Sequence, residues 1–170
     1  MRIVFAFIFT LLFFGHGFAQ KEKDSLYNVW YNIKLSDSTR FEAISNLIQV
    51  HYLYKKTDSA LVLGKQMLDL AEKKKIIEFE IEANALIGKI YFELKDFSAG
   101  EKIYNKGLEL AKTTKDSFLY AEKLFDLGYM YSKYENYTNA FKTLQKSEKI
   151  YRKLGDGLNE GWSIVHQGFI

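Results

Sequence analysis

Three glutamates, Glu42, Glu82 and Glu122, recur forty residues apart and give the chain its clearest regular spacing of chemically active side chains. Further positions in the same phase are polar or aromatic. Together they predict one concave binding face: Glu42, Glu82, Glu122, Gln49, Lys89, Tyr129, Tyr52 and Phe92. Carboxylates beside aromatic rings suit a basic or apolar peptide segment. The alternative is that glutamates in a first helical turn only complement the helix dipole.

Side chains for catalysis or metal binding are sparse. The chain has no cysteine, which excludes disulfides, thiolate zinc sites and cysteine nucleophiles. His16 lies in the signal-like N-terminal segment. His51 takes a place that Tyr91 and Tyr131 hold later, so we expect His51 to be packed and hydrogen-bonded. His166 has no second ligand at helical spacing. We therefore expect no enzyme activity, no metal and no cofactor.

The segment 155–161 carries three glycines and superficially resembles a phosphate-binding loop. It lacks a preceding strand and the Lys-Ser/Thr ending of such loops. It also falls where a turn between repeats is expected, and glycine is common there. We interpret it as a turn.

Composition narrows the class of protein. The 170 residues are 48% hydrophobic and 26% charged, which is enough to build a core, and the net charge is only +3. That charge is too small and too evenly spread to favour nucleic acid as a partner. The chain has no proline, which suits long uninterrupted helices.

An internal repeat of forty residues must position the glutamates. The blocks 45–48, 85–88, 125–128 and 165–168 align without a gap. Apolar residues within each period follow three- and four-residue steps in two stretches, which predicts two antiparallel helices per repeat with Asp96 and Asn136 as caps. The structure should therefore be all-α.

Small residues at fixed phase predict close approach of the two helices. Gly88 or Gly128 on the first helix should meet Gly100 or Ala140 on the second, because both lack bulk. The full set of expected repeat-packing residues is Ala60, Gly88, Tyr91, Gly100, Gly128, Tyr131, Ala140 and Gly168.

The first nineteen residues have the pattern of a secretory signal. One arginine precedes a short apolar run, and small residues lead to cleavage between Ala19 and Gln20. The alternative is an uncleaved anchor. We expect an exported, periplasmic or secreted protein, with a linker or partial helix over 20–37 and the array over 38–170. The repeats are expected at about 41–80, 81–120, 121–160 and, incomplete, 161–170.

The repeat resembles the tetratricopeptide repeat family. Leu127-Gly128, Tyr131, Ala140 and Leu144 match the family pattern fully, and the preceding repeat matches with Gly100 in place of alanine. The first repeat is degenerate. The resemblance implies a right-handed α-solenoid of antiparallel helix pairs that binds protein or peptide and is not catalytic.

A second, weaker resemblance is to the exported sensor regions of Bacteroidetes-type signalling proteins. It rests on the ending Phe18-Ala19-Gln20, on the segments 24–26 and 37–40, and on the segment 57–60. It implies the sensory or scaffold half of a signalling protein. The alternatives are a truncated input region of a histidine kinase, of a class III adenylate or guanylate cyclase or of a helix-turn-helix regulator, and a free-standing scaffold.

The sequence stops in mid-repeat, at the apolar residues Gly168, Phe169 and Ile170. Repeat arrays usually finish with a polar capping helix. We therefore expect a longer natural protein. A link to the membrane would come only from a downstream segment or an uncleaved signal.

Overall fold

A computed structural model describes residues 21–170. The predicted signal and its cleavage point at Ala19 and Gln20 lie outside the described residues. The chain divides into two compact units, Met1–Leu63 and Gly64–Ile170. The helix α3 (Thr57–Lys74) contains the boundary between them.

The first unit contains a helical segment at 21–31, then α2 (Asp37–Asn46) and a π-helical turn, η1 (Leu47–Tyr52). The Ser36 side chain caps α2 by accepting from the backbone N–H of Thr39. Arg40 ties the helical segment to α2, because its Nε donates to the backbone oxygen of Trp30 at 2.9 Å. These contacts surround a small core of Trp30, Phe41, Ala43, Ile44, Leu47 and Ile48.

His51 lies in the π-helical turn. Its Nε2 atom is buried with no hydrogen-bond partner among the described residues, so the expected hydrogen bond is not made at this atom. Its counterparts Tyr91 and Tyr131 lie in regular α-helices, where the backbone takes another path.

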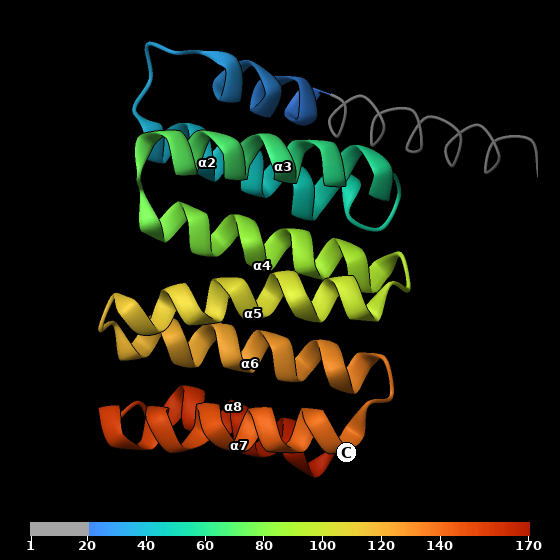
Figure 1. The fold of residues 1–170 in the computed structure, drawn as a ribbon, viewed down its shortest axis with the longest axis vertical. Helices are drawn as coiled ribbons and strands as arrows, with labels where there is room; N and C mark the ends of the chain where they lie inside the picture. The colour runs from blue at the N-terminus through green and yellow to red at the C-terminus, as the bar shows by residue number, and fades with distance from the viewer. Residues whose placement is uncertain (1–20) are drawn as a thin grey trace, which may run out of the picture. The chain divides into compact units, whose positions relative to one another are not determined.

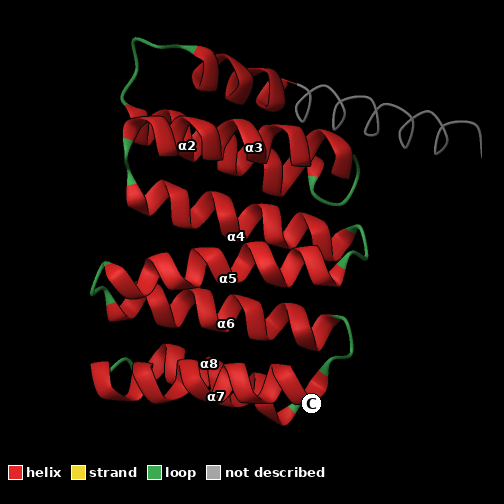
Figure 2. Ribbon diagram, in the orientation of Figure 1, coloured by secondary structure: helices red, strands yellow, loops and turns green. Residues whose placement is uncertain are grey.

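The second unit continues with five further helices that pack consecutively. They are α4 (Ile77–Glu93), α5 (Phe97–Thr113), α6 (Ser117–Lys133), α7 (Tyr137–Leu154) and α8 (Gly157–Gly168). Each begins twenty residues after the one before. In Figure 1, α4 to α7 lie side by side with alternating direction, and Figure 2 shows only helices and loops over the described residues. The all-α architecture and the forty-residue period are confirmed. The first helix of each repeat begins about one helical turn earlier in the chain than the expected start of that repeat.

Every helix junction of this unit contains one residue in the left-handed backbone conformation. One or two residues after each helix, the backbone has a positive φ, at Lys75, Lys95, Lys115, Glu135 and Gly155. The next residue immediately precedes the following helix, and at four junctions its side chain caps that helix: Asp96, Asp116, Asn136 and Asp156. The predicted caps at Asp96 and Asn136 are confirmed. Of the segment 155–161, only Gly155 and Asp156 form the expected turn, because residues 157–161 already belong to α8.

The helices α4 and α5 approach closely through two glycines, as predicted. A methyl group added at Gly88 would lie 2.9 Å from Cβ of Tyr104 and 3.1 Å from the backbone oxygen of Gly100. One added at Gly100 would lie 2.8 Å from Phe92 and 3.2 Å from the oxygen of Gly88. Because Tyr104 Cβ is fixed to the backbone, neither glycine can be enlarged without moving a helix.

The next pair, α6 and α7, uses the equivalent contact. A methyl group at Gly128 would meet Leu144, the counterpart of Tyr104, at 2.7 Å. Ala140 and Ala60 are fully buried. The prediction that Gly168 packs in the same way is wrong, since no atom would lie within 4 Å of a methyl group there. No helix in residues 21–170 packs against that face of Gly168.

A further packing column was missed in the sequence. Gly107 of α5 lies against α4, where a methyl group would be 3.2 Å from the backbone oxygen of Ile81. Forty residues later, Ser147 is buried and its hydroxyl donates to the backbone oxygen of Ala121 at 2.7 Å. The two helices therefore approach closely at this position in both repeats. In one repeat the residue is a glycine without a side chain, and in the next it is a serine that hydrogen-bonds the facing backbone.

Candidate functional site

Charged residues fill the seam between α4 and α6, the first helices of two successive repeats. The Nζ atom of Lys123 lies 2.8 Å from Oε2 of Glu82 and 3.0 Å from Oε1 of Glu122. Lys89 and Asp126 form a second pair at 2.5 Å. We call these five residues the charged seam. Three carboxylates against two ammonium groups leave one excess negative charge.

Lys123 is the central cation of the charged seam. Its side chain is only 7% exposed, whereas those of Glu82 and Glu122 are 27% and 44% exposed. Burial alone would lower the pKa of Lys123. The carboxylates of Glu82, Glu122 and Asp126 outweigh that effect and hold its pKa well above the usual range. The ammonium group is therefore charged at any physiological pH.

Tyr104 of α5 is coupled electrostatically to the same carboxylates. Its side chain is 1% exposed, and its hydroxyl has no hydrogen-bond partner among the described residues. Burial raises the pKa of Tyr104, and the negative charges of Asp126, Glu82 and Glu122 raise it further. The hydroxyl thus remains protonated beneath the seam.

One repeat later the corresponding surface is aromatic instead of charged. The His166 ring of α8 lies edge-to-face against Phe125 and Tyr129 of α6, with ring centroids 5.3 and 5.4 Å away. Trp162 of α8 and Phe169, which directly follows α8, lie 6.4 and 6.5 Å from the same ring. We call these five residues the aromatic patch. Its outer rings reach solvent, since Tyr129, Trp162 and Phe169 are 46%, 53% and 78% exposed.

The structure brings together part of the predicted binding face. Glu82, Glu122, Lys89 and Tyr129 all belong to the charged seam or the aromatic patch. Glu42 and Gln49 are exposed in the first unit, where they bond Ser38 and Ser45. Their alignment with Glu82 stays a prediction.

Two members of the predicted face are buried, so their assignment to a ligand surface is wrong. Phe92 is 1% exposed and packs on Tyr131 and Tyr134, with ring centroids 5.9 Å from each. Tyr52 is 8% exposed, and its hydroxyl lies 3.2 Å from that of Tyr27. Both rings serve the core because the apolar stripe of a first helix extends further around it than the sequence pattern suggested.

Lys123 and Asp126 were missed as functional residues. The signal for Lys123 was present in the repeat, because its column holds Ala43 and Ala83 in earlier repeats and Ser163 in the next. All four positions are buried. A lysine in a column of small buried residues must be paired, and the glutamates of the predicted face are its partners.

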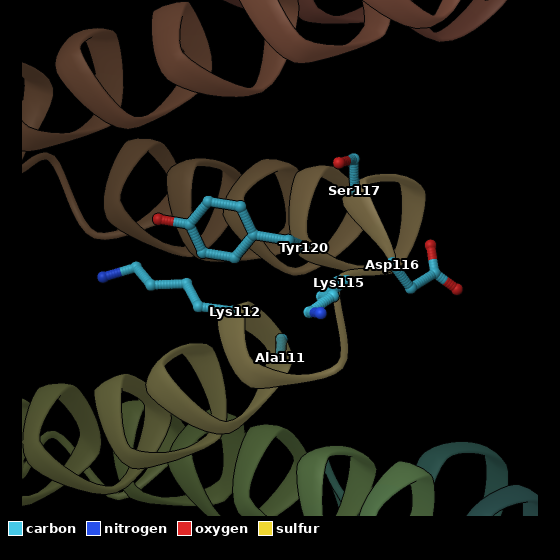
Figure 3. Close-up of a pocket in the computed structure, with 6 residues that line it drawn as sticks. All are labelled: Ala111, Lys112, Lys115, Asp116, Ser117 and Tyr120. Carbon is cyan, nitrogen blue, oxygen red and sulfur yellow. The ribbon is translucent and has the colours of Figure 1, made fainter.

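Two neighbouring cavities lie among the helices α5, α6 and α7. The smaller, of about 140 Å³, lies at the turn from α5 to α6 and is drawn in Figure 3, with Lys112 extending alongside the Tyr120 ring. The larger, of about 270 Å³, lies between α5 and α7 over α6. Lys112 and Tyr120 line both, and the ammonium group lies 5.7 Å from the ring centroid.

The described residues offer no metal centre: over 21–170, no three His, Asp or Glu side chains are grouped to hold an ion. None of the helices in that range has the length and apolar character needed to cross a bilayer.

Comparison with known proteins gives one family match. Residues 81–114 match the model described as tetratricopeptide repeat. The match begins within α4 and runs to the end of α5, so it spans one helical hairpin. Comparison with curated protein sequences gave no match.

Proposed function

We propose that this chain is a non-catalytic repeat module that binds a protein or peptide segment. The tetratricopeptide repeat at 81–114 supports this, because such repeats generally mediate protein–protein interactions. Catalysis is not part of the proposal, since the buried charges of the seam pair with one another and leave no activated nucleophile or base.

The observation that carries the proposal is the solvent-exposed aromatic patch beside the charged seam. Large aromatic side chains dominate binding energy at protein interfaces, and Trp162 on α8 and Phe169 at its C-terminal end are both exposed. Glu122 lies on α6, the helix that also supplies Phe125 and Tyr129. A segment with basic and apolar side chains would find rings for stacking and a carboxylate for its cation.

The proposed setting is outside the cytoplasm. The signal-like pattern of residues 1–19 supports export, and the resemblance to exported sensor regions supports a sensory or scaffolding role in a signalling protein. The module would hold a partner and pass the binding event to an output domain.

An array of synthetic peptides tests the binding proposal. Peptides with fixed apolar residues and varied charge would be presented to the full chain, and binders would be measured in solution by fluorescence anisotropy. We expect peptides that combine lysine or arginine with aromatic residues to bind best. Trp162→Ala and Glu122→Lys should each weaken binding by about tenfold.

Phe141→Ala is the matched control, because Phe141 is 44% exposed but lies on α7, outside the patch. Equal affinities for Trp162→Ala and Phe141→Ala would refute the aromatic patch as the binding surface. ATP turnover by the purified chain would refute the non-catalytic assignment.

A further inference from the structure

The second helices of successive repeats differ at one position, where an acidic residue in one repeat is replaced by a lysine in the next. In the pair α3 and α5, Lys106 forms an ion pair with Glu72 at 3.1 Å. Forty residues later, Lys146 of α7 corresponds to Lys106, but the position of Glu72 is taken by Lys112. The carboxylate that neutralises the first lysine is thus replaced by a second cation.

The lysine that replaces the glutamate lines the larger cavity. Lys112, Lys142 and Lys146 all line it, and Glu109 is the one acidic residue of the lining. Glu109 already forms an ion pair with Lys112. Neither Lys142 nor Lys146 has a carboxylate within ion-pair distance in the part of the chain that the structure describes.

The two unpaired lysines also repel each other. Lys142 and Lys146 are four residues apart on α7, so they lie on the same helix face, where like charges are unfavourable. An anion between α5 and α7 would relieve this repulsion and supply the charge that Glu72 supplies one repeat earlier.

The rest of the cavity is apolar below and polar at the sides. Leu108, Leu124, Leu127 and Tyr131 form its buried base, and all are at most 7% exposed. Asn105, Asn139 and Thr143 add neutral hydrogen-bonding groups. The side chain of Thr143 helps to open the space, since the preceding repeat has the larger Ile103 at this position.

We propose that this cavity is a second binding site, which takes an acidic peptide segment with a carboxylate side chain next to an apolar one. The carboxylate binds Lys142 and Lys146, and the apolar neighbour covers the leucines. A volume of about 270 Å³ holds one or two side chains and is too small for a nucleotide cofactor. The lining comes from α5, α6 and α7 and shares no residue with the charged seam or the aromatic patch.

Direct binding to the full chain tests the site. The probe is a fluorescein-labelled hexapeptide of alternating glutamate and phenylalanine, and its control replaces every glutamate by glutamine. We expect the acidic peptide to bind at least about tenfold more tightly than the neutral one, with an affinity that falls as salt is raised. Equal affinities would overturn the proposal.

Variants place the probe in the cavity. Lys146→Glu and Lys142→Glu should each weaken binding by about tenfold or more, whereas Lys102→Glu should change it less than about twofold. Lys102 is the counterpart of Lys142 one repeat earlier and does not line the cavity, so it carries the same charge change. Equal losses for Lys102→Glu and Lys142→Glu would show a diffuse charge effect and overturn the site.

Lys112→Glu is a sharper test because it restores the arrangement of the preceding repeat. The new carboxylate should pair with Lys146, as Glu72 pairs with Lys106, and the acidic peptide should no longer bind while the fold is retained. Retained binding would overturn the proposal.

Competition separates a peptide from other anions. Inorganic phosphate at equal concentration, or vesicles with anionic headgroups, should not displace the probe, because neither places an apolar group over Leu108 and Leu124. Displacement by either would overturn the peptide assignment. Trp162→Ala should leave this probe bound, so failure here and failure of the proposed function would be separate results.

Discussion

Tyr129 and His166 meet edge-to-face across α6 and α8, with ring centroids 5.4 Å apart, at the positions that Lys89 and Asp126 occupy as an ion pair across α4 and α6. Tyr129 lies forty residues after Lys89, and His166 lies forty residues after Asp126. The backbone of the repeat therefore brings these two positions into contact whatever their chemistry. The side chains then make one junction charged and the next aromatic.

The charged seam should stabilise the second unit through Lys123. Lys123→Ala should lower the free energy of unfolding by about 1–3 kcal/mol, since the seam keeps three carboxylates with one cation; the partial exposure of Glu82 and Glu122 keeps this below the cost for a fully buried pair. Urea denaturation measures it.

A double-mutant cycle isolates the pair itself. Combining Lys123→Ala with Glu82→Gln should give a larger coupling energy than the exposed pair Lys73–Asp69, whose side chains are 70% and 62% exposed. Equal coupling energies would contradict a structural role for the seam.

Gly88 should be intolerant of a methyl group. Gly88→Ala should destabilise the protein by about 1–3 kcal/mol, because the new Cβ would lie 2.9 Å from Tyr104 Cβ. Gly161→Ala is the matched control within α8, where nothing lies within 4 Å, and it should stabilise by about 0.5–1 kcal/mol through helix propensity. Thermal unfolding of both variants would settle the comparison, and equal shifts in Tm would argue against close packing.

The helix junctions predict that glycine is favoured over other residues at both position 135 and position 155, so introducing it and removing it should have opposite effects on stability. Glu135 has a φ of 62°, a conformation that costs a non-glycine residue about 1 kcal/mol or more, so Glu135→Gly should stabilise the protein. Gly155 has a φ of 72°, and Gly155→Ala should destabilise by a similar amount. If both substitutions changed the free energy of unfolding in the same direction, the left-handed junction would be wrong.

Alkaline pH should destabilise the fold through its buried tyrosines. Burial, with smaller contributions from Glu122 and Asp156, raises the pKa of Tyr151 to about 12. A group whose folded pKa is raised stabilises fully below its unfolded pKa of about 10, and that contribution is lost as the pH rises towards 12. Each such group adds a slope of at most about 1.4 kcal/mol per pH unit.

The control is Tyr151→Phe, which should flatten the dependence of the free energy of unfolding between pH 10 and 12. Denaturant titrations at several pH values would show it. An unchanged slope would mean that Tyr151 ionises equally well in the folded and unfolded chain.

The fold followed from the sequence because it depends on local signals. Apolar steps, the small residues at Gly88 and Gly100, and the caps at Asp96 and Asn136 act within one helix or one hairpin. Those signals place each helix without knowledge of distant residues.

The residues of the candidate site could be predicted from the sequence less completely than the fold. Contacts such as Lys123 with Glu82 join residues more than one repeat apart, and the choice between groove and core at Phe92 depends on how far α6 covers α4. A pattern read along one helix shows which residues share a face. It does not show how much of that face the next helix will hide.

The left-handed residue recurs every twenty positions, both inside a hairpin and between hairpins, so the backbone itself does not distinguish the two kinds of connection. What makes a helix inner or outer is then only the side chains that it carries. Duplicating or deleting a block of forty residues would keep every junction geometry intact, and a change of partner requires new residues on existing helices rather than a new path for the chain.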